Sequence, residues 1–172
     1  MGRAFVAIAI FASASIAHAH APVKTRALRL QLQHGRLEGL LAYHVPAAAA
    51  VPYEAAIDLR VALAPAALEG LALQSERGVP LPVKVAEASV SRNPDGSLDA
   101  SFLLEPLKAP PQLRVSVEEG PPLPVTLIAE TGVKLSLVEG PGAPVRGGLS
   151  LRPRRGLPCL VQISVAAKEK PR

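Results

Sequence analysis

Residues 25–45 alternate between apolar and polar side chains, and this period of two is the feature that most constrains the fold. The pattern is divided at His34-Gly35, where a glycine supplies the positive φ that a two-residue hairpin loop needs. Such a loop pairs Gln33 with Arg36 and then brings apolar residues opposite one another along one face. The sequence therefore predicts an antiparallel hairpin of two strands, 25–33 and 36–45.

Short strand-like segments recur along the rest of the chain between turns rich in Gly and Pro. We expect further strands at 68–74, 81–91, 97–105, 112–118, 125–130, 133–138, 148–152 and 159–166. About ten short strands at this spacing predict an all-β fold, an antiparallel β-sandwich of immunoglobulin-like architecture. The likeness to antibody domains is one of architecture alone, because the chain holds no Trp and a single Cys.

The segment 53–64 has two possible structures. Its composition is compatible with a helix, but Ile57, Leu59, Val61 and Leu63 alternate with more polar residues, as in a strand. We favour a strand, with one short helix as the alternative. In either case Pro65 is expected to end the segment.

The string Asn93–Gly96 has the composition of a tight turn between two strands. Together with Asp99 it also resembles a calcium-binding loop. Such loops close with a Glu at the twelfth position, which here is Leu104. We therefore interpret the segment as a hairpin turn.

Residues 71–83 and 113–125 repeat one pattern: a strand, a Glu-x-Gly turn and then Pro-Leu-Pro-Val. Because proline cannot donate to a strand ladder, each Pro-Leu-Pro-Val should begin a strand or lie at a sheet edge. The repeat indicates either two equivalent hairpins or merely the same turn chemistry used twice.

The N-terminus is typical of a secretory signal peptide. A short basic start precedes the charge-free segment 4–16, whose 13 residues are too few to span a membrane. Small residues then allow cleavage after Ala17 or Ala19. We predict a signal peptide at 1–19, a single β-sandwich domain at 20–166 and a basic flexible tail at 167–172. The mature chain has no other apolar stretch of spanning length, and we expect it to be extracytoplasmic, either periplasmic or secreted.

The net charge of +5 is concentrated in the C-terminal part of the chain. We predict that a group of arginines there binds an anionic group of a protein or cell-envelope partner: Arg146, Arg152, Arg154 and Arg155. A solvated hairpin followed by a basic tail is the alternative explanation. Nucleic acid is not expected as a partner, because aromatic residues make up only 3% of the chain.

The sequence lacks the motifs of the common enzyme classes. It contains no Gly-x-Ser-x-Gly elbow, phosphate-binding loop, His-Glu-x-x-His helix or dinucleotide fingerprint. Tryptophan, the usual platform for a sugar, is also absent. We therefore expect a non-enzymatic binding module with no required cofactor.

Histidines allow one alternative function, the binding or handling of copper in the periplasm. After cleavage at Ala19 the new amine and the imidazole of His20 form a chelate similar to that of secreted copper proteins. After cleavage at Ala17, His20 is the third residue, and the chelate is square-planar. The hairpin register pairs His44 with Thr25, near this N-terminus, so His44 is the candidate for a further ligand. His34 lies about 30 Å away, at roughly 3.4 Å per residue, and cannot join the site.

Cys159 is the only cysteine, so no intramolecular disulfide is possible. It lies in an apolar strand-like segment. We interpret it as a small buried hydrophobic residue, with a reactive or intermolecular thiol as the alternative.

Overall fold

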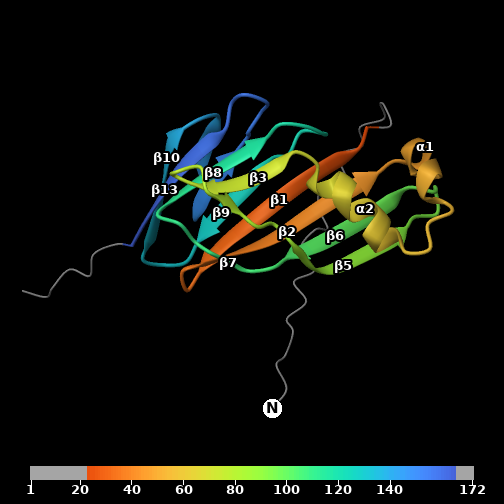
Figure 1. Ribbon diagram of the computed structural model, residues 1–172, viewed down its shortest axis with the longest axis horizontal. Helices are drawn as coiled ribbons and strands as arrows, with labels where there is room; N and C mark the ends of the chain where they lie inside the picture. The colour runs from red at the N-terminus through yellow and green to blue at the C-terminus, as the bar shows by residue number, and fades with distance from the viewer. Residues whose placement is uncertain (1–22, 166–172) are drawn as a thin grey trace, which may run out of the picture.

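The computed structural model describes residues 23–165, which form two packed β-sheets (Figure 1). The larger sheet has eight strands in the order β11-β12-β9-β1-β2-β6-β5, with β7 paired to β2, and the smaller sheet has the order β10-β13-β8-β3-β4. The strands are β1 (Thr25–Gln33), β2 (Arg36–Val45), β3 (Leu71–Ser75), β4 (Pro80–Leu81), β5 (Val85–Arg92), β6 (Leu98–Leu104), β7 (Leu107–Lys108), β8 (Gln112–Val117), β9 (Val125–Ala129), β10 (Val133–Glu139), β11 (Gly142–Val145), β12 (Gly148–Leu151) and β13 (Cys159–Val165). The predicted all-β sandwich is confirmed. One pair, β1 with β9, is parallel rather than antiparallel.

The predicted hairpin is β1–β2, and its register is the expected one. Gln33 lies opposite Arg36, and Thr25 lies opposite His44. Both loop residues have positive φ, 49° at His34 and 72° at Gly35, as a two-residue turn of this handedness requires. Alternate residues of both strands are buried, so the leucine face lies in the core.

Residues 59–68 form a helix, and the strand that we favoured for this segment is wrong. The helix α2 (Leu59–Leu68) follows two short helical turns, α1 (Ala47–Ala50) and η1 (Val51–Tyr53). Asp58 caps α2, because its side chain accepts a hydrogen bond from the Arg60 amide at 2.9 Å. Leu63 and Ala67, one helical turn apart, are buried. Pro65 lies inside the helix rather than at its end.

The other predicted strands are present with shifted ends. The strand expected to start at residue 68 begins at Leu71, because α2 extends to Leu68. The segment expected as a single strand at 81–91 is divided between β4 in the smaller sheet and β5 in the larger. The turn at Asn93–Gly96 connects the antiparallel pair β5–β6, as predicted.

The two copies of the repeat are not equivalent hairpins. In the first copy β3 pairs with β4 inside the smaller sheet. In the second copy the chain leaves β8 in the smaller sheet and enters β9 in the larger one. What the copies share is the chemistry of the turn, and their first strands, β3 and β8, pair with each other.

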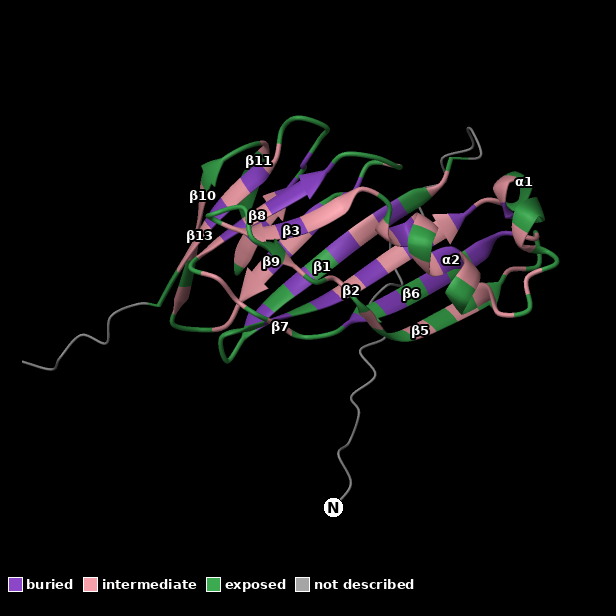
Figure 2. Ribbon diagram, viewed as in Figure 1, coloured by how far each residue is buried: buried purple, intermediate pink, exposed green. Residues whose placement is uncertain are grey.

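The hydrophobic core lies between the sheets and beneath α2. The smaller sheet and α2 lie over different parts of the larger sheet, and buried residues line the strands below them (Figures 1 and 2). Helix α2 contacts β2, β5 and β6. Among the residues described, no helix is long and apolar enough to cross a membrane.

Candidate functional site

Three of the four predicted arginines lie together, and the fourth does not. Arg152, Arg154 and Arg155 belong to the loop between β12 and β13 and line one pocket of about 610 Å³. Arg146 is in the turn between β11 and β12, at the opposite end of β12. At roughly 3.4 Å per strand residue it is about 15–20 Å from Arg152. We call the cavity beside the other three the arginine pocket.

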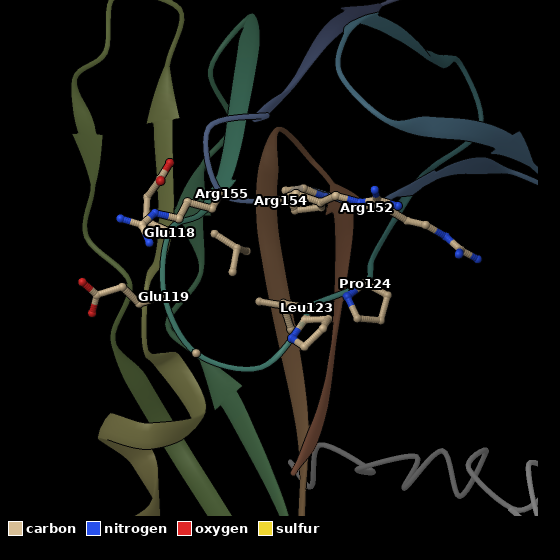
Figure 3. Close-up of a pocket in the computed structure, with 11 residues that line it drawn as sticks. Glu118, Glu119, Leu123, Pro124, Arg152, Arg154 and Arg155 are labelled. Atoms are coloured by element: carbon tan, nitrogen blue, oxygen red, sulfur yellow. The ribbon is translucent and has the colours of Figure 1, made fainter. Parts of the chain in front are cut away.

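The arginine pocket lies between two loops and has an apolar floor (Figure 3). Facing the arginine loop is the segment that joins β8 to β9, which contributes acidic, proline and leucine side chains. The residues of this second wall are Glu118, Glu119, Gly120, Pro122, Leu123 and Pro124, together with Val117 at the end of β8, and Pro153 lies on the arginine side. Figure 3 shows Arg155 extending toward the side where Glu118 and Glu119 lie, whereas Arg152 points away from it.

Backbone hydrogen bonds hold the arginine loop in place. The Arg152 amide donates to the Pro141 carbonyl at 2.9 Å. Arg154 and Leu157 exchange two hydrogen bonds of 3.1 and 2.8 Å, which closes a tight turn around Gly156. Pro153 is buried between the exposed arginines. The loop therefore presents its cations from a fixed backbone, which reduces the entropy lost when a ligand binds.

A buried arginine holds the opposite wall. Arg26 lies on the core face of β1, and its residue is 3% exposed. Its guanidinium donates to four main-chain carbonyl oxygens, in each case at 3.0 Å or less: those of Ala67, Glu69, Glu119 and Pro121. Burial is the main influence on its pKa and lowers it, while the negative charge of Glu69 acts in the opposite direction. Arg26 thus ties the end of α2 and the β8–β9 loop to β1.

The sequence contains a signal for the burial of Arg26, which was not predicted. Residues 26, 28, 30 and 32 share one side of β1, and all four are buried. A cation in the same row as three core leucines must find acceptors inside the protein, because a buried charge without partners is strongly destabilising. Its acceptors come from segments remote in sequence, so they were not predictable.

The arginine pocket carries an excess of positive charge. Its lining contains three arginines and two glutamates. Within residues 23–165, no salt bridge joins these arginines to Glu118 or Glu119. The guanidinium donors therefore remain available for an external carboxylate or phosphate, which they bind in a forked geometry.

Of the predicted copper ligands, the structure places His44. His20 lies outside the described residues. The Nδ1 atom of His44 lies 2.7 Å from Oδ1 of Asp99, and the two residues are directly opposite each other in the β2–β6 ladder. Burial raises the pKa of Asp99, but hydrogen bonds from Asn93 and His44 outweigh it, so the net shift is downward. Residues 23–165 contain no group of three or more His, Cys, Asp or Glu that would hold a metal ion.

The turn that precedes β6 completes this polar cluster. The side-chain amide of Asn93 donates to Oδ2 of Asp99 at 2.7 Å, and Asp95 accepts from both the main-chain amide and the hydroxyl of Ser97. These bonds within the turn satisfy the side chains that the calcium alternative would have used. The pair of His44 and Asp99 was not expected, because it depends on the register of two strands that are distant in sequence.

Cys159 is completely buried at the start of β13. Its thiol donates to the Pro141 carbonyl at 3.2 Å. Burial raises its pKa, which keeps the sulfur protonated and unreactive. The structure thus supports the interpretation of Cys159 as a small core residue.

Comparison of the chain with protein-family models and with curated proteins found no match.

Proposed function

We propose that this protein is an extracytoplasmic, non-enzymatic binding module that holds an anionic group of a protein or cell-envelope partner in the arginine pocket. The observation that carries the proposal is the placement of Arg152, Arg154 and Arg155 on one fixed loop above an apolar floor. Leu123, at the floor, is 1% exposed and is anchored in the core.

The composition of the pocket defines the ligand group. A carboxylate or phosphate satisfies the free guanidinium donors, and an apolar portion attached to it fits against Leu123 and the prolines. Glu118 and Glu119 border the same space and repel groups whose negative charge is spread widely. The pocket therefore favours a compact anion with an apolar neighbour over a long polyanion.

Binding of purified mature protein to cell-envelope fractions and to vesicles containing phospholipids with anionic phosphate headgroups tests the proposal. Exchange of all three pocket arginines for alanine should weaken binding at least tenfold. The control is Arg146→Ala, which removes one positive charge of the same kind outside the pocket and should change binding less than twofold. Unchanged binding in the triple variant, or an equal loss in Arg146→Ala, would contradict the assignment.

A second candidate function, copper binding through His20 and His44, is supported by the contact between His44 and Asp99. A carboxylate at Nδ1 orients the ring and leaves Nε2 for a metal, an arrangement common around metal-bound histidines. The confirmed register also places His44 opposite Thr25, which follows His20 by five residues in the sequence.

The copper proposal depends first on where the chain begins. Mass spectrometry of the secreted protein should find His18 or His20 as the first residue. Copper titration should then show weaker affinity in both His20→Ala and His44→Ala, with His34→Ala as the control. Any other first residue, or unchanged affinity in His20→Ala, would rule this function out.

A further inference from the structure

The groove between α2 and β5 has the features of a site for an extended peptide. Strand β5 forms one edge of the larger sheet, and β11 forms the other. Two adjoining cavities, of about 760 and 540 Å³, lie along the groove and share Asp58, Arg60 and Ala88. Figure 1 shows α2 lying over the face of the larger sheet near this edge, and Figure 2 shows β5 with half-buried and exposed residues only. This groove is separate from the arginine pocket, with which it shares no lining residue.

The backbone of β5 offers hydrogen-bonding groups to a partner strand. The main-chain amide of Asn93 donates to the Ser97 carbonyl at 2.9 Å, so the pair next to the turn is a hydrogen-bonded one. Bonded and non-bonded pairs alternate in an antiparallel ladder. Ser91 therefore bonds to β6, while Val90 and Arg92 direct their amide and carbonyl groups outward, where no described residue pairs with them.

The helical wall adds an apolar surface and one further acceptor. Val61, Ala64, Pro65 and Leu68 lie along the side of α2 that lines the groove, and the Val61 residue is 71% exposed. Because Pro65 has no amide hydrogen, the Val61 carbonyl lacks its usual helical donor. Ile57 extends the exposed apolar surface at the other end of the groove.

The charges of the groove indicate what the partner carries. Arg60 and Asp58 satisfy each other through two side-chain hydrogen bonds of 3.0 and 2.9 Å. Glu87 has no salt bridge within the described part of the chain, so it is the uncompensated charge of the groove. A lysine or arginine on the partner would neutralise it.

We infer that the outer edge of β5 accepts an extended segment of a partner protein as an added strand, with small apolar side chains against α2 and a basic residue beside Glu87. Unpaired main-chain groups recognise a polypeptide in extended conformation, and alternate pockets select its side chains. A lipid or a sugar would not complete the row of amide and carbonyl groups along β5.

Selection of displayed random dodecapeptides on the immobilised mature protein provides the probe. The enriched peptides should show apolar residues at every second position and at least one Lys or Arg. N-methylation of one set of alternate residues in a selected synthetic peptide should weaken binding at least tenfold, whereas methylation of the other set should change it less than twofold. This test leaves the protein unaltered, so its result does not depend on the folding of a variant.

Two variants locate the site. Glu87→Gln should weaken binding of a selected basic peptide about two- to fivefold, as expected for a surface ion pair. The matched control Glu38→Gln removes an exposed carboxylate from β2 and should leave affinity unchanged. The inference is overturned if no peptide is enriched, if helical spacing is selected, or if N-methylation shows no alternation. It is also overturned if binding is lost in the arginine-pocket variant instead, a result that would leave the proposed function intact.

Discussion

Arg26 donates a hydrogen bond of 2.8 Å from Nη2 to the main-chain oxygen of Glu119, and this contact connects a buried cation of β1 to the wall of the arginine pocket. The same guanidinium also reaches the last turn of α2 through the oxygen of Ala67. The pocket therefore depends on a core residue that does not itself line it.

Replacement of Arg26 by methionine should lower the free energy of unfolding by about 3–5 kcal/mol, because it leaves several buried carbonyl oxygens without a donor. Urea denaturation measures the change. The control Arg29→Met, on the exposed side of β1, should stay within about 0.5 kcal/mol of wild type. Equal effects of the two substitutions would show that the buried hydrogen bonds are not important for stability.

Gly120 should tolerate a methyl group less well than Gly78. Both have positive φ, 82° and 73°, which costs a non-glycine residue about 1–2 kcal/mol. A Cβ at Gly120 would lie 2.9 Å from Arg26 Nη2 and 3.0 Å from Oε2 of Glu69, whereas nothing lies within 4 Å of one at Gly78. Thermal unfolding should show a larger loss for Gly120→Ala, by about 1 kcal/mol. A loss in Gly78→Ala that is as large or larger would refute this packing argument.

The parts of the fold that follow from adjacent residues were predictable. His34-Gly35 determines the β1–β2 register because a two-residue loop leaves only one pairing, and Asn93–Gly96 forms the turn that its composition indicates. Helix α2 was not predicted because its apolar residues fit both the period of a helix and the period of a strand. Its N-cap, Asp58, was the local signal for a helix.

The candidate site was only partly predictable. Three clustered arginines are visible in the sequence because they are neighbours along the chain. Their separation from Arg146, by contrast, depends on where β12 begins and ends. The Glu118 wall and the Asp99 partner of His44 come from pairings between distant strands, which no local pattern specifies.

Asp58 should make the stability of the protein sensitive to acid. Hydrogen bonds from the side chain and amide of Arg60 lower its pKa from 3.8 to about 2. A lowered folded-state pKa contributes stability that is complete above pH 4 and is lost as the pH falls toward 2. Asp58→Asn keeps a capping side chain but does not titrate, so its melting temperature should be below wild type at pH 6, and the difference should shrink by pH 2. A constant difference across this range would contradict the role of Asp58.

Replacement by alanine should raise the free energy of unfolding at Pro65 and lower it at Pro94. Pro65→Ala restores the missing helical hydrogen bond to the Val61 carbonyl. The unfolded chain also gains conformational entropy, which opposes this effect, so the net stabilisation should be about 1–2 kcal/mol. Pro94 follows Asn93 in the β5–β6 turn, at a position where proline presets φ, so Pro94→Ala should cost about 0.5–1 kcal/mol. Calorimetry of the two variants compares them. Destabilisation by Pro65→Ala would show that the proline ring contributes more through packing than its missing amide costs.

Cys159 should resist thiol reagents in the native protein. Its side chain is fully buried, it donates to Pro141, and burial raises its pKa, so the thiolate that reacts is scarce. Modification then requires opening of β13, and its rate should be about 10³-fold or more below that of the unfolded chain. Ellman's reagent measures both rates, because the protein unfolded in about 6 M guanidinium chloride should react with one equivalent at once. Rapid reaction without denaturant would mean that the strand carrying Cys159 opens readily, and the arginine loop that precedes it would then not be rigid.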